Sequence, residues 1–269
     1  KRQGYSLHKR EKWDKIAVLE NRCEGEFCLD RIDILGVGFD AVTCQEAVAR
    51  AMALICAHKS GYAVTPNSEI VYAARHDAAL RQTLNGADLV LPDGIGVVYA
   101  SRILGRPIPG KVAGIEFAEA LMRAMAQAGK SVFLLGAKPG VAQQAADRLT
   151  QRIPGLIVAG VKDGYFKRDE EAVEAIRQSG ADAAFVCLGV PKQEFFIAQH
   201  LQECGVSFMG GFGGSLDVFA GVVDRAPQAW IDHGFEWLYR LKKEPQRIGR
   251  MMRLPLFLFA AMGARLRGE

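Results

Sequence analysis

The sequence predicts an α/β protein: a Rossmann-like, mostly parallel sheet with helices on both faces, followed by a C-terminal helical appendage rich in basic residues. Three observations lead to this prediction. Between residues 31 and 209, short β-branched and apolar runs alternate with longer amphipathic segments, which is typical of a parallel sheet covered by helices. Glycine and polar residues stand where these runs end. Beyond Pro227 no strand is expected, and the chain becomes helical, aromatic and basic.

The expected elements follow one another in a regular order. The first helix should begin at Thr43, because Thr43 and Glu46 have the spacing of a capping box and Val48, Met52 and Ile55 share one face. Further helices are expected from about residues 68 and 94 and over 114–128, 170–179 and 193–203. Another helix is expected to contain Pro139 in its first turn. Strands are expected over residues 32–37, 62–65, 88–91, 131–135, 156–161, 183–188 and 206–209.

The composition is that of a folded protein. Of the 269 residues, 49% are hydrophobic and 24% charged, which excludes extensive disorder. The formal net charge of +4 does not by itself indicate nucleic-acid binding. The six cysteines lack metal-ligand spacing and are expected to be free thiols in a reducing cytoplasm. Residues 1–15 do not read as a secretory signal, and the longest apolar run, 254–264, is far shorter than the ~20 residues that span a bilayer.

Polar residues gather at five expected strand-to-helix junctions. In an open parallel sheet these junctions share one edge, where ligands bind. Any one of them has an alternative explanation in turn geometry, because glycine and asparagine also end strands. Their joint occurrence predicts a polar ligand cleft. The junctions are Thr65-Pro66-Asn67, Pro92-Asp93-Gly94, Gly136 to Gly140, Gly189 to Glu194, and Gly210 to Ser215 with Asp217 beyond.

Asp93 is the candidate catalytic residue. It lies on a stiff turn between Pro92 and Gly94, where a carboxylate can act as a general base, although it could equally cap the following helix. Thr65 and Asn67 could bind a substrate through hydroxyl and amide groups, or cap a helix. Gln193 could bind a sugar or phosphate, or be an ordinary surface residue of a helix. Lys111 is a candidate cation beside a leaving group, although most single lysines are simply solvated.

Two glycine-containing loops are candidate diphosphate sites. Free N–H groups at the start of a helix favour an anion. The loop of Gly136, Lys138 and Gly140 could equally be a plain turn. The loop of Gly213 and Gly214, followed by Asp217, carries more glycines than one turn needs, which favours ligand contact. No Asp-x-Asp, HExxH or Walker motif occurs in the sequence, so we expect no metal site and no cofactor.

The tail combines basic and apolar residues. Basic side chains recur from Arg240 to Arg267 with Glu244 as the only acid, interleaved with aromatic and aliphatic residues. This pattern favours an interfacial helix on an anionic membrane surface. The alternatives are helices packed on the core with solvated basic residues, or RNA binding, which no accompanying motif supports. We expect residues 1–30 to be a loosely packed or mobile lead-in, residues 31–226 a catalytic α/β domain, and residues 227–269 a membrane-proximal appendage.

Several of these motifs resemble one known family. The chain is similar to the WecG/TagA/CpsF glycosyltransferases (glycosyltransferase family 26) over roughly residues 33–255. The motifs that carry the resemblance are Thr65-Pro-Asn67-Ser-Glu, Leu91-Pro-Asp93-Gly-Ile-Gly96, Gly136-Ala-Lys-Pro-Gly140, Gly189-Val-Pro-Lys-Gln193-Glu, Gly213-Gly214-Ser-Leu-Asp217, Arg225-Ala-Pro227, Glu236-Trp-Leu-Tyr-Arg240 and Glu244-Pro245.

The resemblance implies an inverting, metal-independent transfer from a UDP-sugar to an undecaprenyl-diphosphate-linked acceptor, in the synthesis of teichoic acid or another surface polysaccharide. The sugar would be N-acetylmannosamine or its uronic acid, with glucose as an alternative. The resemblance also implies Asp93 as the base, and Arg240, Arg247 and Arg250 in contact with the lipid diphosphate. Lys111 departs from the arginine that the family often has there and lacks its bidentate fork. Such an enzyme would be peripheral to the inner face of the cell membrane.

Two other functions compete with a transferase. Gly36, Gly38 and Ala41 fit the loose G-x-G-x-x-A pattern of a nucleotide-cofactor oxidoreductase, although no acid lies near residues 55–62 to hold a ribose. A non-enzymatic lipid- or partner-binding scaffold would use the basic tail alone. The sequence is compatible with a homo-oligomer.

Overall fold

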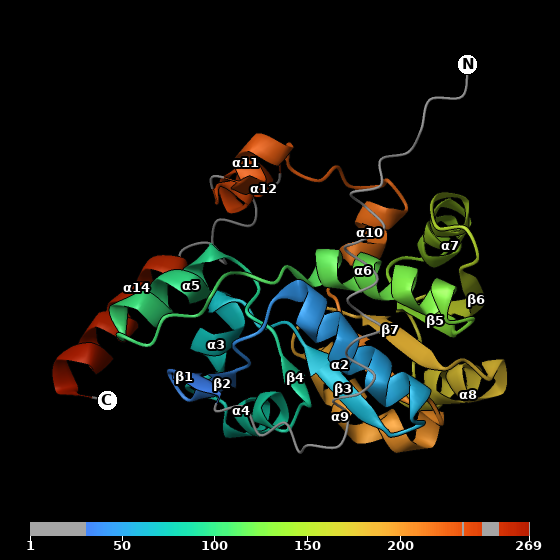
Figure 1. The fold of residues 1–269 in the computed structure, drawn as a ribbon, viewed down its shortest axis with the longest axis horizontal. Helices are drawn as coiled ribbons and strands as arrows, with labels where there is room; N and C mark the ends of the chain where they lie inside the picture. The colour runs from blue at the N-terminus through green and yellow to red at the C-terminus, as the bar shows by residue number, and fades with distance from the viewer. Residues whose placement is uncertain (1–30, 233, 244–252, 269) are drawn as a thin grey trace. The chain divides into compact units, whose positions relative to one another are not determined.

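The computed structural model of the chain describes residues 31–232, 234–243 and 253–268. Its centre is a six-stranded sheet in which every neighbouring pair of strands is parallel (Figure 1). The strand order is β4–β3–β8–β7–β5–β6. This confirms the parallel α/β fold. The strands are β3 (Gly61–Val64), β4 (Leu89–Val90), β5 (Ser131–Gly136), β6 (Ile157–Lys162), β7 (Ala183–Cys187) and β8 (Phe208–Gly211).

Helices cover both faces of the sheet, as predicted. Strand β5 shows the division, because Val132 and Leu134 belong to one core cluster and Phe133 and Leu135 to another. This alternation follows from the two-residue repeat of a strand. The first cluster includes α2 (Cys44–Cys56), α6 (Gly114–Gln127), α7 (Val141–Arg152) and α10 (Ser215–Phe219). The second includes α8 (Asp169–Ser179) and α9 (Lys192–Cys204).

Local sequence signals explain where several helices begin. The side chain of Thr43 accepts a hydrogen bond from the Glu46 N–H and the Glu46 side chain accepts one from the Thr43 N–H, so the predicted capping box is confirmed. Pro139 lies just before the N-cap of α7, Gly140, rather than in the first turn. A helix that the sequence analysis did not identify, α4 (Ala78–Asn85), begins at Asp77, whose side chain accepts from the N–H of Leu80.

The expected strand over residues 32–37 is confirmed only for residues 32–34, and these residues are not part of the parallel sheet. The chain instead forms an antiparallel hairpin of β1 (Ile32–Ile34) and β2 (Val37–Phe39). Leu35 and Gly36 form its turn with positive φ angles of 55° and 90°. Gly36 therefore lies in a hairpin turn and Gly38 within a strand, so the G-x-G-x-x-A pattern is not the loop between a strand and a helix that cofactor binding requires. This removes the basis of the oxidoreductase alternative.

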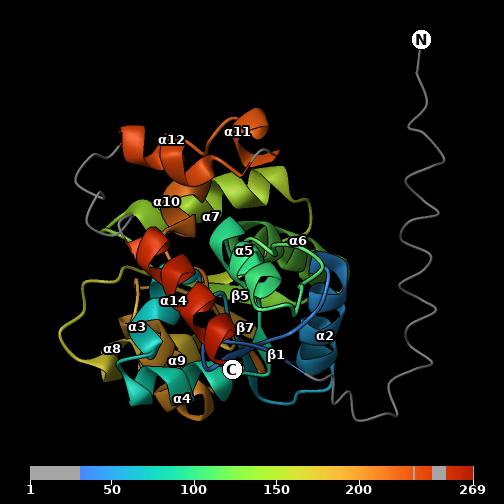
Figure 2. The ribbon, with the colours of Figure 1, turned by 90° about the vertical axis from the view of Figure 1, so that its left-hand side faces the viewer.

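A third core cluster joins the hairpin to the C-terminal helix. It includes residues of the hairpin, of α3 (Ser68–Ala74), α4 and α5 (Ile95–Ile103), and of α14 (Arg253–Arg267). Helix α14 contacts α3 and α5 (Figure 2). Its residues Phe257, Ala261 and Ala264 are buried. Among the tail alternatives, packing on the core is therefore confirmed for this face of α14.

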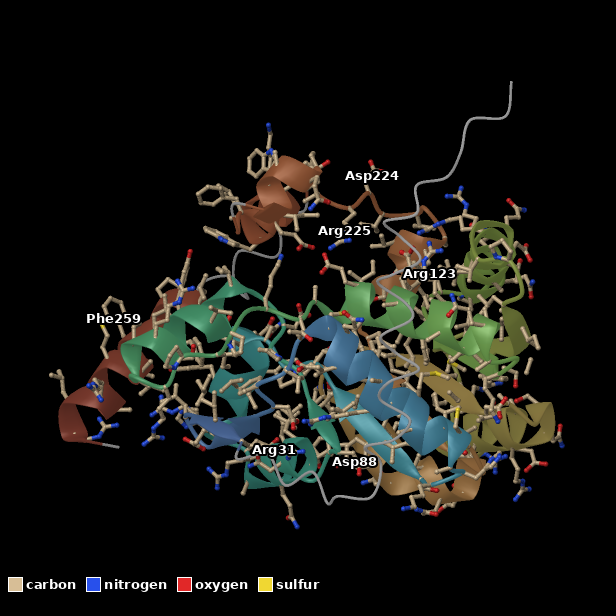
Figure 3. All side chains as sticks on the ribbon, viewed as in Figure 1. Arg31, Asp88, Arg123, Asp224, Arg225 and Phe259 are labelled. Carbon is tan, nitrogen blue, oxygen red and sulfur yellow. The ribbon has the colours of Figure 1, made fainter. Side chains whose placement is uncertain are left out.

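The other side of α14 is apolar and exposed. Leu256, Phe259, Met262 and Leu266 recur three or four residues apart and have exposed fractions of 49%, 66%, 40% and 88%. Phe259 is labelled in Figure 3 on α14. No helix within the described part of the chain is both long enough and apolar enough to cross a bilayer. Two shorter helices, α11 (Gln228–Asp232) and α12 (Glu236–Lys243), precede α14. Residues 1–30, predicted to be a lead-in, lie outside the described residues.

Candidate active site

The five predicted junctions form one row along the carboxyl edge of the sheet, and hydrogen bonds link most of its loops. The N–H of Asp93, after β4, donates to the Pro66 carbonyl after β3 at 3.4 Å. Thr65 Oγ1 in turn donates to the Gly211 carbonyl at the end of β8 at 3.0 Å. The N–H of Gly213 donates to Gln193 Oε1 after β7 at 2.9 Å. We call these loops, together with the loop after β5, the carboxyl-edge row.

Asp93 is half-buried in the turn that follows β4. The N-cap of the next helix, α5, is Gly94, with a φ of 87° and no side-chain cap hydrogen bond. The alternative in which Asp93 caps that helix is therefore wrong. Gly94 supplies a backbone conformation that other residues rarely adopt, and this conformation fixes the direction in which the chain leaves Asp93.

Thr65 and Asn67 differ in what they do. Asn67 is the N-cap of α3, and its Oδ1 accepts from the N–H groups of Glu69 at 2.9 Å and Ile70 at 3.1 Å. The capping alternative is therefore confirmed for Asn67. Thr65 is 8% exposed and joins β3 to β8 through its bond to Gly211, so it is not a cap. Both residues stand one loop away from Asp93.

The loop of Lys111 lies against the turn of Asp93. The Val112 N–H donates to the Pro92 carbonyl at 2.8 Å, so Lys111 is one residue from a direct contact with this turn. Its side chain is half-buried. The loop continues into α6 at Gly114, where a Cβ would lie 2.9 Å from Thr65 Oγ1. A larger residue at position 114 would displace Thr65, because real Cβ atoms essentially never approach that closely.

Gln193 and Glu194 are buried at the start of α9, with exposed fractions of 2% and 1%. The alternative of Gln193 as a surface residue is wrong, because the loop after β8 covers it. Gln193 Nε2 donates to Glu194 Oε1 at 2.8 Å. Glu194 Oε2 is buried and has no hydrogen-bond partner within the described residues. Burial raises the pKa of Glu194 from 4.5 to about 7, against a smaller lowering by Gln193.

Glu194 is the residue of this site that sequence reasoning did not assign a role. A glutamate in the first turn of a helix normally indicates a favourable interaction with the helix dipole at the surface. The adjacent glycine-rich loop after β8 could have signalled burial, since it must pass close to the start of α9. In the folded chain the Glu194 carboxyl fixes the Gln193 amide, and the other end of that amide holds Gly213.

The predicted diphosphate loops lie further along the row. At Gly136 a Cβ would lie 2.2 Å from the Cys187 carbonyl oxygen, and its φ is 133°, so close strand packing requires this glycine. Lys138 and Gly140 are exposed, and Gly140 is the N-cap of α7 with no side-chain cap bond. Four strand spacings of about 4.8 Å separate β4 from β5, so this loop stands roughly 19 Å from the strand of Asp93.

The loop after β8 is nearer to Asp93. Gly213 has a φ of 52° and is half-buried, and Gly214 is exposed. A Cβ at Gly214 would lie 3.8 Å from Asp217 Oδ2, and the Asp217 carbonyl accepts from the N–H of Val222 at 2.9 Å. The Gly213–Gly214 loop therefore adjoins both Gln193 and the β3 end of the row.

Two arginines from the C-terminal part of the chain form ion pairs beside this edge of the sheet. Arg225, labelled in Figure 3, belongs to the loop between α10 and α11. Its Nη2 lies 2.5 Å from Glu116 Oε1 in the first turn of α6. Arg253, the first residue of α14, lies 3.2 Å from Glu69 Oε1 in the first turn of α3. Of the predicted lipid-diphosphate residues, Arg240 belongs to α12 but its side chain is outside the described part. Arg247 and Arg250 lie entirely outside the described residues.

Within residues 31–232, 234–243 and 253–268, no group of three or more His, Cys, Asp or Glu side chains is arranged to hold a metal ion. The four cysteines in this part, Cys44, Cys56, Cys187 and Cys204, are free thiols. Metal independence itself stays a prediction about the reaction.

The fold and the carboxyl-edge row define a Rossmann-like α/β protein with a polar ligand site at the carboxyl ends of its strands. Comparison with known proteins narrows this class. The Glycosyl transferase WecG/TagA/CpsF family matches residues 32–269. Two relatives carry the same name, N-acetylglucosaminyldiphosphoundecaprenol N-acetyl-beta-D-mannosaminyltransferase.

The relative from Bacillus spizizenii strain W23 is 38% identical over 205 residues, which cover 76% of this chain and 80% of the relative. The relative from Staphylococcus aureus strain MW2 is 37% identical over 233 residues, covering 85% and 91%. The chain belongs to the WecG/TagA/CpsF family of glycosyl transferases, and it is a glycosyltransferase. The resemblance drawn from the sequence motifs is confirmed.

Proposed function

We propose that this enzyme transfers N-acetylmannosamine, or its uronic acid, from a UDP-sugar to an undecaprenyl-diphosphate-linked N-acetylglucosamine, in the synthesis of teichoic acid or a related surface polysaccharide. The observation that carries the proposal is the carboxyl-edge row, in which the N–H of Asp93 donates to the Pro66 carbonyl within the Thr65–Asn67 loop. The names of the two relatives supply the sugar and the acceptor. The UDP part of the donor rests on the resemblance and on the glycine loops.

The chemistry assigns Asp93 the role of general base. The acceptor hydroxyl oxygen bonds to the anomeric carbon while the bond from that carbon to the UDP oxygen breaks. The proton of the hydroxyl passes to the Asp93 carboxylate, and UDP leaves with the bonding electron pair. Attack from the face opposite UDP inverts the anomeric configuration. A positioned base of this kind contributes about 10²–10⁴-fold to the rate.

The remaining residues of the row position the donor and stabilise the leaving group. Asn67 would bind the sugar from the neighbouring loop through its amide nitrogen, which the capping bonds do not use, and Thr65 would do so through its hydroxyl oxygen. Gln193 holds the Gly213–Gly214 loop near the diphosphate. Lys111 and the N–H groups of the glycine loops balance the charge that develops on UDP, a role that a metal ion has in other transferases. Gly136, Lys138 and Gly140 would contact the far end of the nucleotide. Asp217 supports the Gly214 loop.

A lipid-linked acceptor requires the enzyme to work at a membrane surface, and α14 supports this part of the proposal. Its exposed apolar residues are accompanied by Arg253, Arg265 and Arg267, the composition of an interfacial helix. Helices α11 and α12 add an apolar hollow of about 250 Å³ lined by Ala229, Trp230, Phe235 and Leu238. Arg240, Arg247 and Arg250 are proposed to contact the lipid diphosphate, and the inner face of the cell membrane is the proposed location.

The test measures UDP release and disaccharide formation on a short-chain lipid-diphospho-N-acetylglucosamine, with a panel of UDP-sugars and with a chelator present. Asp93→Asn should lower kcat by about 10²–10⁴-fold without loss of folding. Asp163→Asn is the matched control. Asp163 follows β6 at the same sheet edge, beyond the row, and its Oδ1 accepts from the Tyr165 N–H. Equal rates for Asp93→Asn and the parent enzyme would refute the role of Asp93, and a donor other than the mannosamine sugars would correct the substrate.

A further inference from the structure

A second cavity lies away from the carboxyl-edge row. It has a volume of about 230 Å³ and opens to solvent between the β1–β2 turn, the end of α3, α4, the loop after α5, and α14. Helix α5 runs between the two places: Asp93 precedes its first turn, whereas Leu104 and Arg106, which line the cavity, follow its last. Nine residues of helix at 1.5 Å each place them about 13 Å apart along the axis of α5.

Three arginines from three different elements line this cavity: Arg75 at the end of α3, Arg81 on α4 and Arg106 after α5. Among the described residues of the lining, Asp33 is the only carboxylate, and its Oδ1 accepts a hydrogen bond from the Gly36 N–H at 3.3 Å. Within the described residues, no carboxylate lies within 4.0 Å of the three guanidinium groups. The lining thus has an excess of two positive charges that no ion pair in this part of the chain neutralises.

The neighbouring backbone holds this arrangement in place. Arg81 crosses the hairpin turn so closely that a Cβ at Gly36 would lie 3.2 Å from its Cδ. A fourth arginine, Arg265 of α14, donates from Nη1 to the Leu104 carbonyl at 3.3 Å. Arg75 lies 5.9 Å from the ring centroid of Tyr72, measured from Cζ. The hairpin turn therefore limits the movement of the Arg81 stem, and the Tyr72 ring lies beside the Arg75 guanidinium. Arg106 is exposed in the loop after α5 and completes the lining from a third side.

We propose that this cavity binds the phosphate group of a small anion. Guanidinium groups donate paired hydrogen bonds that match the oxygens of a phosphate, and several of them from separate elements make a specific site rather than a diffuse charge. The volume is below the ~300–1,000 Å³ of pockets that hold drug-sized ligands, so it suits a phosphate or a headgroup better than a nucleotide-sugar. The proposal does not depend on the transferase function.

Two sources could supply this phosphate. Helix α14 lines the cavity with Ala264 and also exposes apolar side chains to solvent, so the headgroup of an anionic phospholipid is one source. A soluble phosphate ester is the other. The two differ in whether binding requires a bilayer, and this difference can be measured directly.

The test compares Arg75→Gln/Arg81→Gln with a control pair, Lys59→Gln/Arg168→Gln, in the full chain. The control removes the same charge from exposed residues outside the cavity lining. If the cavity double variant fails to fold, Arg106→Gln replaces it, since Arg106 is exposed in a loop. Binding of inorganic phosphate and of glycerol phosphate is followed by calorimetry at fixed ionic strength, because screening alters any charge effect. Partition onto phosphatidylcholine vesicles with and without phosphatidylglycerol is followed by sedimentation.

We expect the cavity variant to lose about tenfold in affinity for each arginine removed, while the control pair retains the parent affinity. Loss of soluble phosphate binding would support the proposal and assign a soluble ester as the source. Loss confined to phosphatidylglycerol vesicles would support it and assign a lipid headgroup. Absence of saturable binding by the parent protein to every probe, or equal losses in the cavity variant and the control pair, would overturn it.

Discussion

The buried carboxyl of Glu194 makes the stability of this protein depend on pH in a defined direction. Its pKa of about 7 in the folded chain exceeds the ordinary value of 4.5, chiefly because burial disfavours the charged form. Between these values the folded protein holds a proton that the unfolded chain has lost. The free energy of unfolding therefore falls as pH rises from about 4.5 to about 7, and the whole penalty is present above 7. The difference in pKa corresponds to about 3 kcal/mol.

Glu194→Gln removes this titration and keeps the oxygen that accepts from Gln193. At pH 8 the free energy of unfolding of the variant should be about 3 kcal/mol higher than that of the parent, which corresponds to a rise in Tm of roughly 6–12 °C. Below pH 4.5 the two proteins should have the same stability. Urea unfolding at a series of pH values measures this. Glu170→Gln, which removes an exposed glutamate at the start of α8, should follow the parent at every pH. Parallel curves for the parent and Glu194→Gln would refute the burial argument.

Two further changes test packing and surface separately. Gly136→Ala would place a Cβ 2.2 Å from the carbonyl oxygen of Cys187 and should cost about 1–3 kcal/mol or more in chemical denaturation, whereas Gly110→Ala, with open space around the new Cβ, should cost far less. Phe259→Ala should weaken sedimentation with anionic vesicles by several-fold without changing Tm, since Phe259 is 66% exposed. Tyr165→Ala, which removes an aromatic ring that is 67% exposed elsewhere, is its control, and equal vesicle binding by both variants would contradict the assignment of α14.

The parts of the fold that sequence reasoning predicted are those with local causes. The Thr43 box sets the start of α2, and the alternation of β5 records two buried faces. The hairpin was not predicted because its turn uses Leu35 and Gly36, both with positive φ. Asparagine or aspartate usually precedes glycine in such turns, so a leucine before glycine does not indicate a hairpin. The Asp77 cap of α4 was present in the sequence but stands in a short helix between two other elements.

The candidate site was predicted as a set of loops, and its interior depended on contacts between distant segments. The order of residues at the strand ends was enough to place Asp93 near Asn67, because parallel strands share one edge. The burial of Gln193 and Glu194 was not foreseeable from α9 alone. It arises from the loop after β8, whose Gly211 and Gly213 pack against Gln193.

The buried side of α14 has a practical consequence for dissecting the tail. Phe257 and Ala261 belong to the same buried cluster as Val97 and Leu104 of the α/β body, so a chain cut before residue 253 would expose apolar residues of the body that this helix covers. Such a truncated protein would aggregate or unfold whether or not the full chain binds membranes. Loss of activity in the truncated protein would therefore reflect loss of folding before it reflects loss of membrane contact. Single replacements along the outward stripe, which is exposed rather than packed in the core, are the cleaner way to ask what the tail does at a bilayer.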